Sequence, residues 1–176
     1  MAKLKIIALP DPLLRKKSAA VERVDDELRK LMDDMLAIMY EAPGLGLAGI
    51  QVAVPRRVLV MDVAESEVEE PERNPICMVN PEILSRGDEM RLHEEGCLSI
   101  PEFFAEIERP NSCRVRYANR DGETEEMLCE GLLSTVVQHE IDHLNGKLFI
   151  DYLSRLKRDM VVKKFIKSNK SDTVMA

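Results

Sequence analysis

The sequence predicts an α+β fold in which mostly antiparallel β-sheets pack around a central helix, with one further helix toward each end of the chain. Three observations lead to this prediction: runs of alternating or β-branched residues lie between runs of helical periodicity, tight turns such as Asp121-Gly122 join successive strands, and no βαβ rhythm repeats. A chain of 176 residues, 45% of them hydrophobic, suits one domain with a sizeable core. We expect this domain to span residues 1–168 and residues 169–176 to form a flexible tail.

The expected elements follow from local periodicity and from turn residues. Apolar residues recur at spacings of three and four over residues 26–40, behind the acidic pair Asp25 and Asp26 and before Pro43-Gly44, which predicts an amphipathic helix. Strands are predicted over residues 57–63, 76–80, 113–118 and 124–129, the last two as a hairpin. Helices are predicted over residues 130–144, stopped by Asn145-Gly146, and from the cap Ser154 through Ile166.

Composition argues against several classes of function. The chain has 32 acidic and 25 basic side chains, a formal charge of −7, and no Trp, which is unusual for a general nucleic-acid binder or a specific DNA-binding protein. No apolar run reaches the roughly 18 residues of a membrane span, and the N-terminus lacks the apolar stretch of a signal peptide. The four cysteines form no CxxC pair. We therefore expect a cytoplasmic protein that does not contact a membrane.

The most informative motif is the HExxH of residues 139–143, which lies on the predicted central helix. Helical pitch places His139 and His143 on one face, one turn apart, so both imidazoles can reach a single divalent metal ion while Glu140 stands beside it. The chain has only three histidines, and the positions around the motif are apolar. This pattern favours a metal site over two exposed histidines on an ordinary helix.

A tetrahedral catalytic metal site needs a third protein ligand and keeps its fourth position for water. No histidine follows His143, so the third ligand is expected upstream: His93, an acidic residue, or Cys97 within EGCLSI. Spacing alone leaves His93 and Cys97 both open, because a cysteine is as often a small buried hydrophobic residue.

Residues 44–51 read GLGLAGIQ and match the GxGxxG pattern of dinucleotide-binding proteins. The match lacks its structural context, because it follows a predicted helix instead of a strand, and Pro55 prevents a helix after the last glycine. We therefore reject a dinucleotide site. The glycines can instead expose backbone groups at a sheet edge, where an extended peptide pairs by strand addition and the Gln51 amide points into a site.

The segments GLGLAGIQ, EGCLSI and QHEIDHLNG, in this order and at these separations, resemble the motifs of the peptide deformylase family. The resemblance covers essentially the whole chain, including IALPDPLLRKK near the start and MVNPEIL at residues 78–84. It implies a single catalytic metallohydrolase domain that removes the N-formyl group from the N-terminal methionine of nascent polypeptides. It also implies one divalent metal ion, most commonly Fe(II) in the cell, with Zn, Ni or Co accepted in purified protein.

The resemblance also implies roles for particular residues. The metal ligands would be the cysteine of the second motif and both histidines of the third, namely Cys97, His139 and His143. Glu140 would be the general base and acid toward a metal-bound water or hydroxide, and Gln51 and the Leu98 backbone amide would stabilise the oxyanion. One departure from the family pattern is Gly49, which stands where a second consecutive alanine is usual, and the missing methyl is expected to loosen this segment slightly.

Substrate-binding residues are expected from two segments. The first is the glycine-rich edge of Gly44, Leu45 and Gly46. The second is the central helix, where Leu132 and Val136 lie seven and three residues before His139. They would either wall an apolar slot for a methionine side chain or belong to the ordinary core.

Two further pairs of residues have open roles. Phe103 and Phe104 are candidates for the outer part of a substrate groove or for plain packing. Glu95 and Arg109 are candidates either for orienting the metal ligands or for a surface ion pair. The acidic residues 64–75, which include two prolines, are expected to form an exposed loop.

Charge is distributed unevenly along the chain, because residues 155–176 carry seven basic and two acidic side chains. This predicts a basic C-terminal helix, which would either dock weakly on the ribosome or remain a solvated face. Two rival functions also stay open. One is a metallopeptidase that cleaves an internal amide, and the other is a structural metal protein in which His93 closes the coordination shell and Glu140 has no chemical role.

Overall fold

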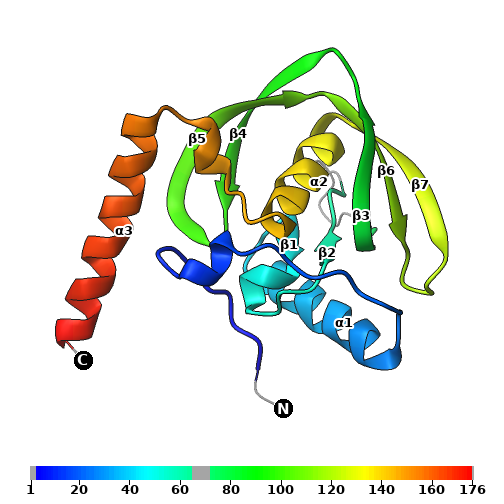
Figure 1. Cartoon of the computed structure of the whole chain (residues 1–176), viewed down its shortest axis with the longest axis horizontal. Helices are drawn as coiled ribbons and strands as arrows, with labels where there is room; N and C mark the ends of the chain where they lie inside the picture. Colours follow the sequence, from blue (N-terminus) through cyan, green and yellow to red (C-terminus); the bar gives the residue numbers. More distant parts are fainter. Residues whose placement is uncertain (1–2, 65–71, 176) are drawn as a thin grey trace.

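The computed structural model describes residues 3–64 and 72–175 of the chain. It confirms the α+β prediction, with antiparallel strands and helices α1, α2 and α3 (Figure 1). The elements in chain order are the 3-10 helix η1 (Pro12–Arg15), α1 (Asp26–Glu41), β1 (Gly46–Ala48), the 3-10 helix η2 (Gly49–Val52), β2 (Val58–Met61), β3 (Ile76–Arg86), β4 (Met90–Cys97), β5 (Ile100–Pro110), β6 (Ser112–Ala118), β7 (Thr124–Glu130), α2 (Gly131–Leu144), the 3-10 helix η3 (Phe149–Tyr152) and α3 (Arg155–Met175).

Five strands form one antiparallel sheet in the order β1-β2-β3-β6-β7, and α1 and α2 pack on its two faces. Successive side chains of β2 point to opposite faces of the sheet, which explains this arrangement. Leu59 and Met61 join the core beneath α2, whereas Val58 and Val60 join the core beneath α1. β1 stands at one edge of this sheet, where its only partner among the described strands is β2.

The strands β4 and β5 form a separate two-stranded antiparallel sheet. Together with the larger sheet it surrounds α2, which lies at the centre of the molecule in Figure 1. Ile100 and Ile107 of β5 pack with Phe149 of η3 and Val161 of α3 in a third apolar cluster. The metal-binding motif on α2 is therefore held between two sheets.

Most helix boundaries agree with the sequence. The Asp25 side chain caps α1 by accepting a hydrogen bond from the backbone nitrogen of Leu28 at 2.9 Å. Gly146, with φ of 75°, adopts the left-handed conformation just after α2, as expected from Asn145-Gly146. The last helix, however, continues past the predicted end at Ile166 to Met175. The flexibility of residues 169–176 stays a prediction.

The strands expected from the sequence do not include β4 and β5. Apolar and polar residues do not alternate cleanly along these strands, because exposed positions carry apolar residues such as Leu92 and Phe104 as well as glutamates. The hairpin of β6 and β7 is confirmed, with Cys113 opposite Cys129. The predicted loop 64–75 lies largely outside the described residues. Across the described chain, no helix is both long and apolar enough to span a membrane.

Candidate metal centre and active site

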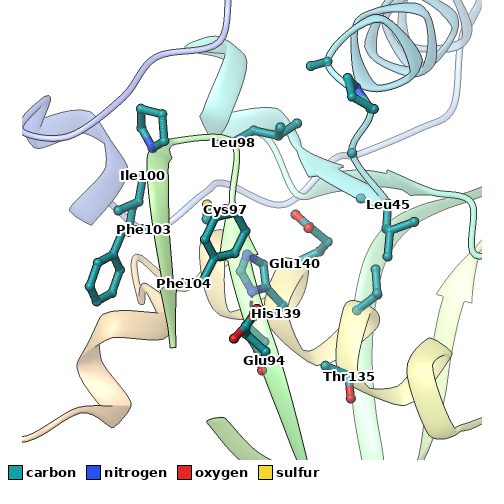
Figure 2. A pocket seen from close by; sticks show the side chains of 18 of the residues that line it. Leu45, Glu94, Cys97, Leu98, Ile100, Phe103, Phe104, Thr135, His139 and Glu140 are labelled. Atoms are coloured by element: carbon teal, nitrogen blue, oxygen red, sulfur yellow. Dashed lines mark hydrogen bonds and ion pairs between the residues drawn. The ribbon is translucent and has the colours of Figure 1, made fainter. Parts of the chain in front are cut away.

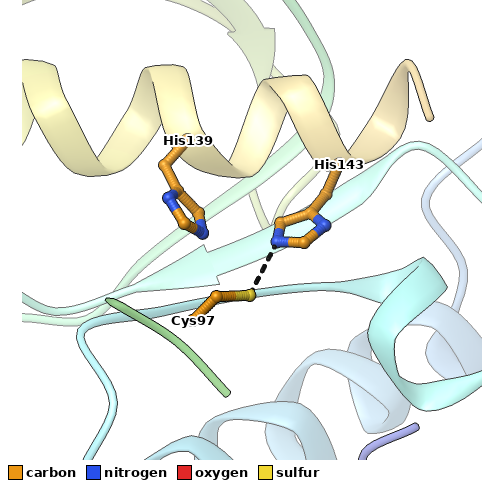
Figure 3. A group of neighbouring side chains, drawn as sticks. All are labelled: Cys97, His139 and His143. Carbon is orange, nitrogen blue, oxygen red and sulfur yellow. Dashed lines mark hydrogen bonds between the residues drawn. The ribbon is translucent and has the colours of Figure 1, made fainter. Parts of the chain in front are cut away.

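The two histidines of α2 and one cysteine of β4 form a compact cluster (Figure 3). His139 and His143 are 8% and 1% exposed, and one ligand atom from each of them and the Cys97 sulfur all lie within 4.8 Å of one another. The Cys97 Sγ lies 3.3 Å from the His143 Nε2. Two imidazoles and a thiol at this spacing suit a divalent metal with a fourth position left for water. His93 lies on β4 opposite Ile107 and is not in the cluster.

A buried carboxylate orients the first histidine. The Glu95 Oε1 lies 2.8 Å from the His139 Nδ1, and Arg109 donates to both Glu95 oxygens, at 2.7 and 3.0 Å. Both side chains are buried, which excludes the alternative of a surface ion pair. A carboxylate that accepts from Nδ1–H leaves Nε2 free to bind a metal. Burial opposes the charge of Glu95, but the hydrogen bonds from His139 and Arg109 outweigh it and lower the Glu95 pKa.

The second histidine lies in a different environment. His143 Nδ1 is buried and has no hydrogen-bond partner among the described protein groups. Burial lowers the His143 pKa well below its ordinary value. A neutral imidazole with an available lone pair is the form that binds a metal ion.

Glu140 lies beside the cluster with an unsatisfied carboxylate oxygen. It is 4% exposed, and its Oε2 has no hydrogen-bond partner within the described structure. Burial raises the pKa of Glu140 to about 7. Across from it, a Cβ built on Gly46 would lie 2.6 Å from the Glu140 Oε1, so only a glycine lets β1 approach this carboxylate so closely. A carboxyl group in this setting can exchange protons near neutral pH.

The Gln51 side chain is held in one orientation by hydrogen bonds at both ends. Its Oε1 accepts from the Ala48 backbone nitrogen at 2.9 Å, and its Nε2 donates to the Ser99 hydroxyl at 3.1 Å and faces the Cys97 sulfur at 3.6 Å. The amide donor therefore points toward the metal cluster, as the sequence predicted for Gln51. Sequence reasoning missed Ser99, although it lies inside the quoted EGCLSI motif and is fully buried.

A cavity of about 460 Å³ opens beside the cluster (Figure 2). Every residue predicted to bind substrate lines it: Gly44, Leu45, Gly46, Leu132 and Val136. Leu98, in the turn between β4 and β5, also lines it. Val136 and Leu132 pack in the core and also line the cavity, and their contact with a methionine side chain stays a prediction.

Aromatic residues of β5 complete the cavity wall. Phe103 and Phe104 both line it, and Phe104 is 62% exposed. Phe103 also packs against Phe149 with ring centroids 6.0 Å apart. The cavity is thus lined largely by apolar side chains, with a smaller number of polar groups that include Gln51, His139 and Glu140, the arrangement typical of a small-ligand site.

The glycine-rich segment leads from α1 through β1 into the 3-10 helix η2, which is incompatible with a dinucleotide-binding βαβ unit. Gly49 does not leave this segment loose: a Cβ there would lie 2.8 Å from the Val54 carbonyl oxygen and 3.1 Å from that of Arg56. The backbone fills the space that an alanine methyl would occupy, which corrects the expected loosening.

Comparisons with known proteins agree with this site. The family model described as polypeptide deformylase matches residues 3–159. A peptide deformylase of Agrobacterium fabrum is 57% identical over 163 residues, which cover 93% of this chain and 94% of the relative. The crystal structure of a peptide deformylase from Ehrlichia chaffeensis is 40% identical, with a TM-score of 0.90 over 98% of this chain and 99% of that one.

A third relative was crystallised with a bound peptide. It is the class I type b peptide deformylase from Acinetobacter baumannii in its Met-Ala-Ser-bound structure, 36% identical, with a TM-score of 0.79 over 86% of this chain and 99% of that one. The Cys97, His139 and His143 cluster is typical of deformylases. This chain therefore belongs to the polypeptide deformylase family and is a metal-dependent hydrolase.

Proposed function

We propose that this deformylase releases formate from the N-terminal formyl-methionine of nascent chains, with Glu140 moving the protons and Gln51 and the Leu98 amide stabilising the oxyanion. The observation that carries this assignment is the buried, unpartnered Glu140 carboxylate beside the Cys97, His139 and His143 cluster. A group with no structural hydrogen bond to make at that oxygen is available for chemistry.

The three cluster residues fit a divalent metal ion. Glu95 directs the His139 lone pair to the cluster, and His143 has a neutral ring. An ion held by these residues would supply a water activated by a lowered pKa. We propose Fe(II) in the cell, with Zn, Ni or Co accepted by the same donors in purified protein. An iron-containing enzyme should lose activity in air, because both Fe(II) and the Cys97 thiolate are oxidisable.

Glu140 acts first as a base and then as an acid. With a pKa raised to about 7, its carboxylate takes a proton from the attacking water and returns one to the departing amine. Gln51 and the Leu98 backbone nitrogen stabilise the charge that develops on the formyl oxygen during the attack, before the amine departs. One such donor is worth about 3–4 kcal/mol in a comparable acyl-transfer site.

The peptide is proposed to bind as an added strand along the edge of β1. Gly44, Leu45 and Gly46 offer backbone groups there, and Leu132 and Val136 wall the slot for the methionine side chain. The Met-Ala-Ser peptide bound to the Acinetobacter baumannii relative supports a substrate that begins with methionine. Substrates of this kind arise during translation, so we propose that the enzyme works in the cytoplasm.

The test is formate release from formyl-Met-Ala-Ser by protein purified without oxygen, with metal content measured. Glu140→Gln should retain its metal and lose turnover, whereas the exposed Glu126→Gln on β7 should match the wild type. Residual turnover of the metal-replete Glu140→Gln near the wild-type rate would contradict the role of Glu140. Incubation with an unformylated peptide tests the metallopeptidase alternative, which predicts internal cleavage.

We further propose that α3 docks on the ribosome through its outer face. Its inner face packs through Val161, Val162 and Phe165, which leaves Leu156 and Met160 exposed at 72% and 62%. Exposed lysines continue along this helix: Lys163, Lys164, Lys167 and Lys170. Figure 1 shows α3 at the side of the molecule. A basic helix with an apolar start suits a ribosomal surface of RNA and protein.

Co-sedimentation with ribosomes at increasing salt tests the docking of α3. Lys163→Glu combined with Lys167→Glu should abolish binding that wild-type protein loses gradually as salt rises. Arg114→Glu on β6 reverses one exposed charge away from α3 and, compared with each single lysine change, should leave binding unchanged. Wild-type binding by the lysine variant, or wild-type binding that does not depend on salt, would contradict docking through this helix. Unaltered, salt-insensitive binding by a chain lacking residues 169–176 would count against a contribution of the tail.

A further inference from the structure

The buried carboxylate Asp62 lies directly behind the cavity wall formed by residues 42–46. It follows β2 and is 6% exposed. One oxygen accepts hydrogen bonds from the Tyr40 hydroxyl at 2.6 Å and the Asn74 backbone nitrogen at 3.0 Å, and the other accepts from the Ala64 backbone nitrogen at 3.0 Å. A buried carboxylate is costly unless such donors compensate, so Asp62 holds these chain segments at one point.

Asp62 forms hydrogen bonds just before the cavity wall, with Tyr40, and near its other end, with Leu45. Tyr40 lies in the last turn of α1, and the wall begins directly after that helix. At the other end of the wall, the Asp62 backbone nitrogen donates to the Leu45 carbonyl oxygen at 2.9 Å and extends the β1-β2 ladder, in which Gly46 pairs with Met61. The side chain of Asp62 therefore fixes the end of α1, and its main chain fixes Leu45.

The wall needs such anchors because it contains two glycines, Gly44 and Gly46, whose backbone freedom is large. Leu45 between them lines the cavity and is 44% exposed. Gly46 lies against the Glu140 carboxylate. A small shift of this wall changes the width of the groove in which the peptide is proposed to lie.

We propose that Asp62 and Tyr40 are positioning residues for peptide binding, and that their hydrogen bond fixes the wall of residues 42–46 at the distance from α2 that the substrate requires. This inference rests on the proposed binding of the peptide along β1. Burial and the Asp62 hydrogen bond raise the pKa of Tyr40 to about 12, so its hydroxyl remains a donor throughout the neutral range. Neither side chain lines the cavity, so both act through the wall.

The test compares Tyr40→Phe, Asp62→Asn and the double variant in steady-state deformylation of formyl-Met-Ala-Ser, with metal content measured. Each single variant should raise KM about fivefold, equivalent to about 1 kcal/mol, with kcat within about twofold of the wild type. The double variant should show less than the sum of the two single effects, because both changes weaken the Tyr40–Asp62 hydrogen bond, although Asp62→Asn also disturbs the bonds from Ala64 and Asn74. Tyr117→Phe is the matched control, since it removes a 2.8 Å hydrogen bond to Glu125 on the distant hairpin.

A merely structural hydrogen bond predicts a different pattern. Tyr40→Phe and Tyr117→Phe would then lower Tm alike, and neither would change KM. An unchanged KM in Tyr40→Phe, an equal rise in Tyr117→Phe, or additive effects in the double variant would each overturn the proposal. Tyr40→Phe loses one oxygen atom and retains the ring on which Arg73 packs at 4.1 Å, so it is the variant expected to fold. Absence of turnover in the metal-loaded wild type would instead contradict the proposed function.

Discussion

A methyl group added at Gly46 tests the contact between β1 and Glu140. The new Cβ would lie 2.6 Å from the Glu140 Oε1 and 2.9 Å from its Cγ. Ordinary contact begins near 3.4 Å, so the carboxylate or the strand has to move by about 0.8 Å. Gly46 is not among the residues with positive φ, so alanine suits the backbone itself. Misplacement of a reacting group by about 1 Å costs about 100-fold, and we expect kcat of Gly46→Ala to fall by about 30- to 100-fold.

Gly44→Ala is the matched control for this prediction. Its Cβ would lie 2.7 Å from the Leu98 Cδ1, a comparably short contact. That atom is the far end of a flexible side chain, which can move to another rotamer. We therefore expect kcat of Gly44→Ala to stay within about threefold of the wild type, since no proton-transferring group is displaced.

The assay is formate release at saturating formyl-Met-Ala-Ser, with metal content and Tm recorded for both variants. Metal content should remain that of the wild type in both, because neither glycine contacts the ligand cluster. A wild-type kcat in Gly46→Ala would refute the argument that Glu140 requires this close approach of β1. An equal loss in Gly44→Ala would assign the effect to the flexibility of the wall instead.

Three further outcomes follow from the site. Glu95→Gln weakens the hydrogen-bond acceptor of the His139 Nδ1. The metal affinity should therefore fall by about 10- to 100-fold, measured by competition with a coloured chelator. Wild-type affinity in this variant would contradict the role of Glu95 in orienting His139. Ser99→Ala removes the hydroxyl that the Gln51 amide contacts, so kcat should fall. The loss should be smaller than the loss of about 100-fold expected for Gln51→Ala. Equal losses in the two variants would show that Ser99 does more than position the amide. The pKa of Tyr40 is raised from 10.0 to about 12 by burial and Asp62, so its contribution to stability is fully present below pH 10 and lost as pH rises through 12. The difference in phenolate absorbance between the wild type and Tyr40→Phe over a pH titration measures the pKa of Tyr40. A midpoint near pH 10 would contradict the raised pKa.

The part of the site that the sequence predicts is the part encoded locally. His139 and His143 face one side because four residues span about one helical turn, whatever the rest of the chain does. Cys97 joins them only because β4 and the turn after it pass in front of α2, which depends on contacts distant in sequence. From the residues alone its role stayed open against His93, and the family resemblance correctly favoured it.

Burial is the second quantity that spacing does not reveal. Glu95 and Arg109 are a common pair of charges on neighbouring strands, and only their 4% and 2% exposure shows that they support His139 and not a solvated surface. Ser99 gives no pattern either, because a single hydroxyl can contact water or a distant amide equally well. The two-stranded sheet of β4 and β5 was missed for a related reason, since its outer face mixes apolar and acidic residues.

The ion network around Arg109 separates stability from function. Arg109 and Glu95 are buried behind the metal cluster, and Arg109 also binds the partly buried Asp142 at 2.8 Å. Removing one partner of such a pair costs about 3–5 kcal/mol, whereas replacing the pair by apolar residues is often neutral or stabilising by about 1–4 kcal/mol. We therefore expect Arg109→Met alone to lower Tm strongly. Glu95→Leu with Arg109→Met should recover part of the lost Tm, since Asp142 still lacks its cation, and should bind metal weakly because no acceptor remains for the His139 Nδ1. If the double variant bound metal as tightly as the wild type, the network would serve stability alone.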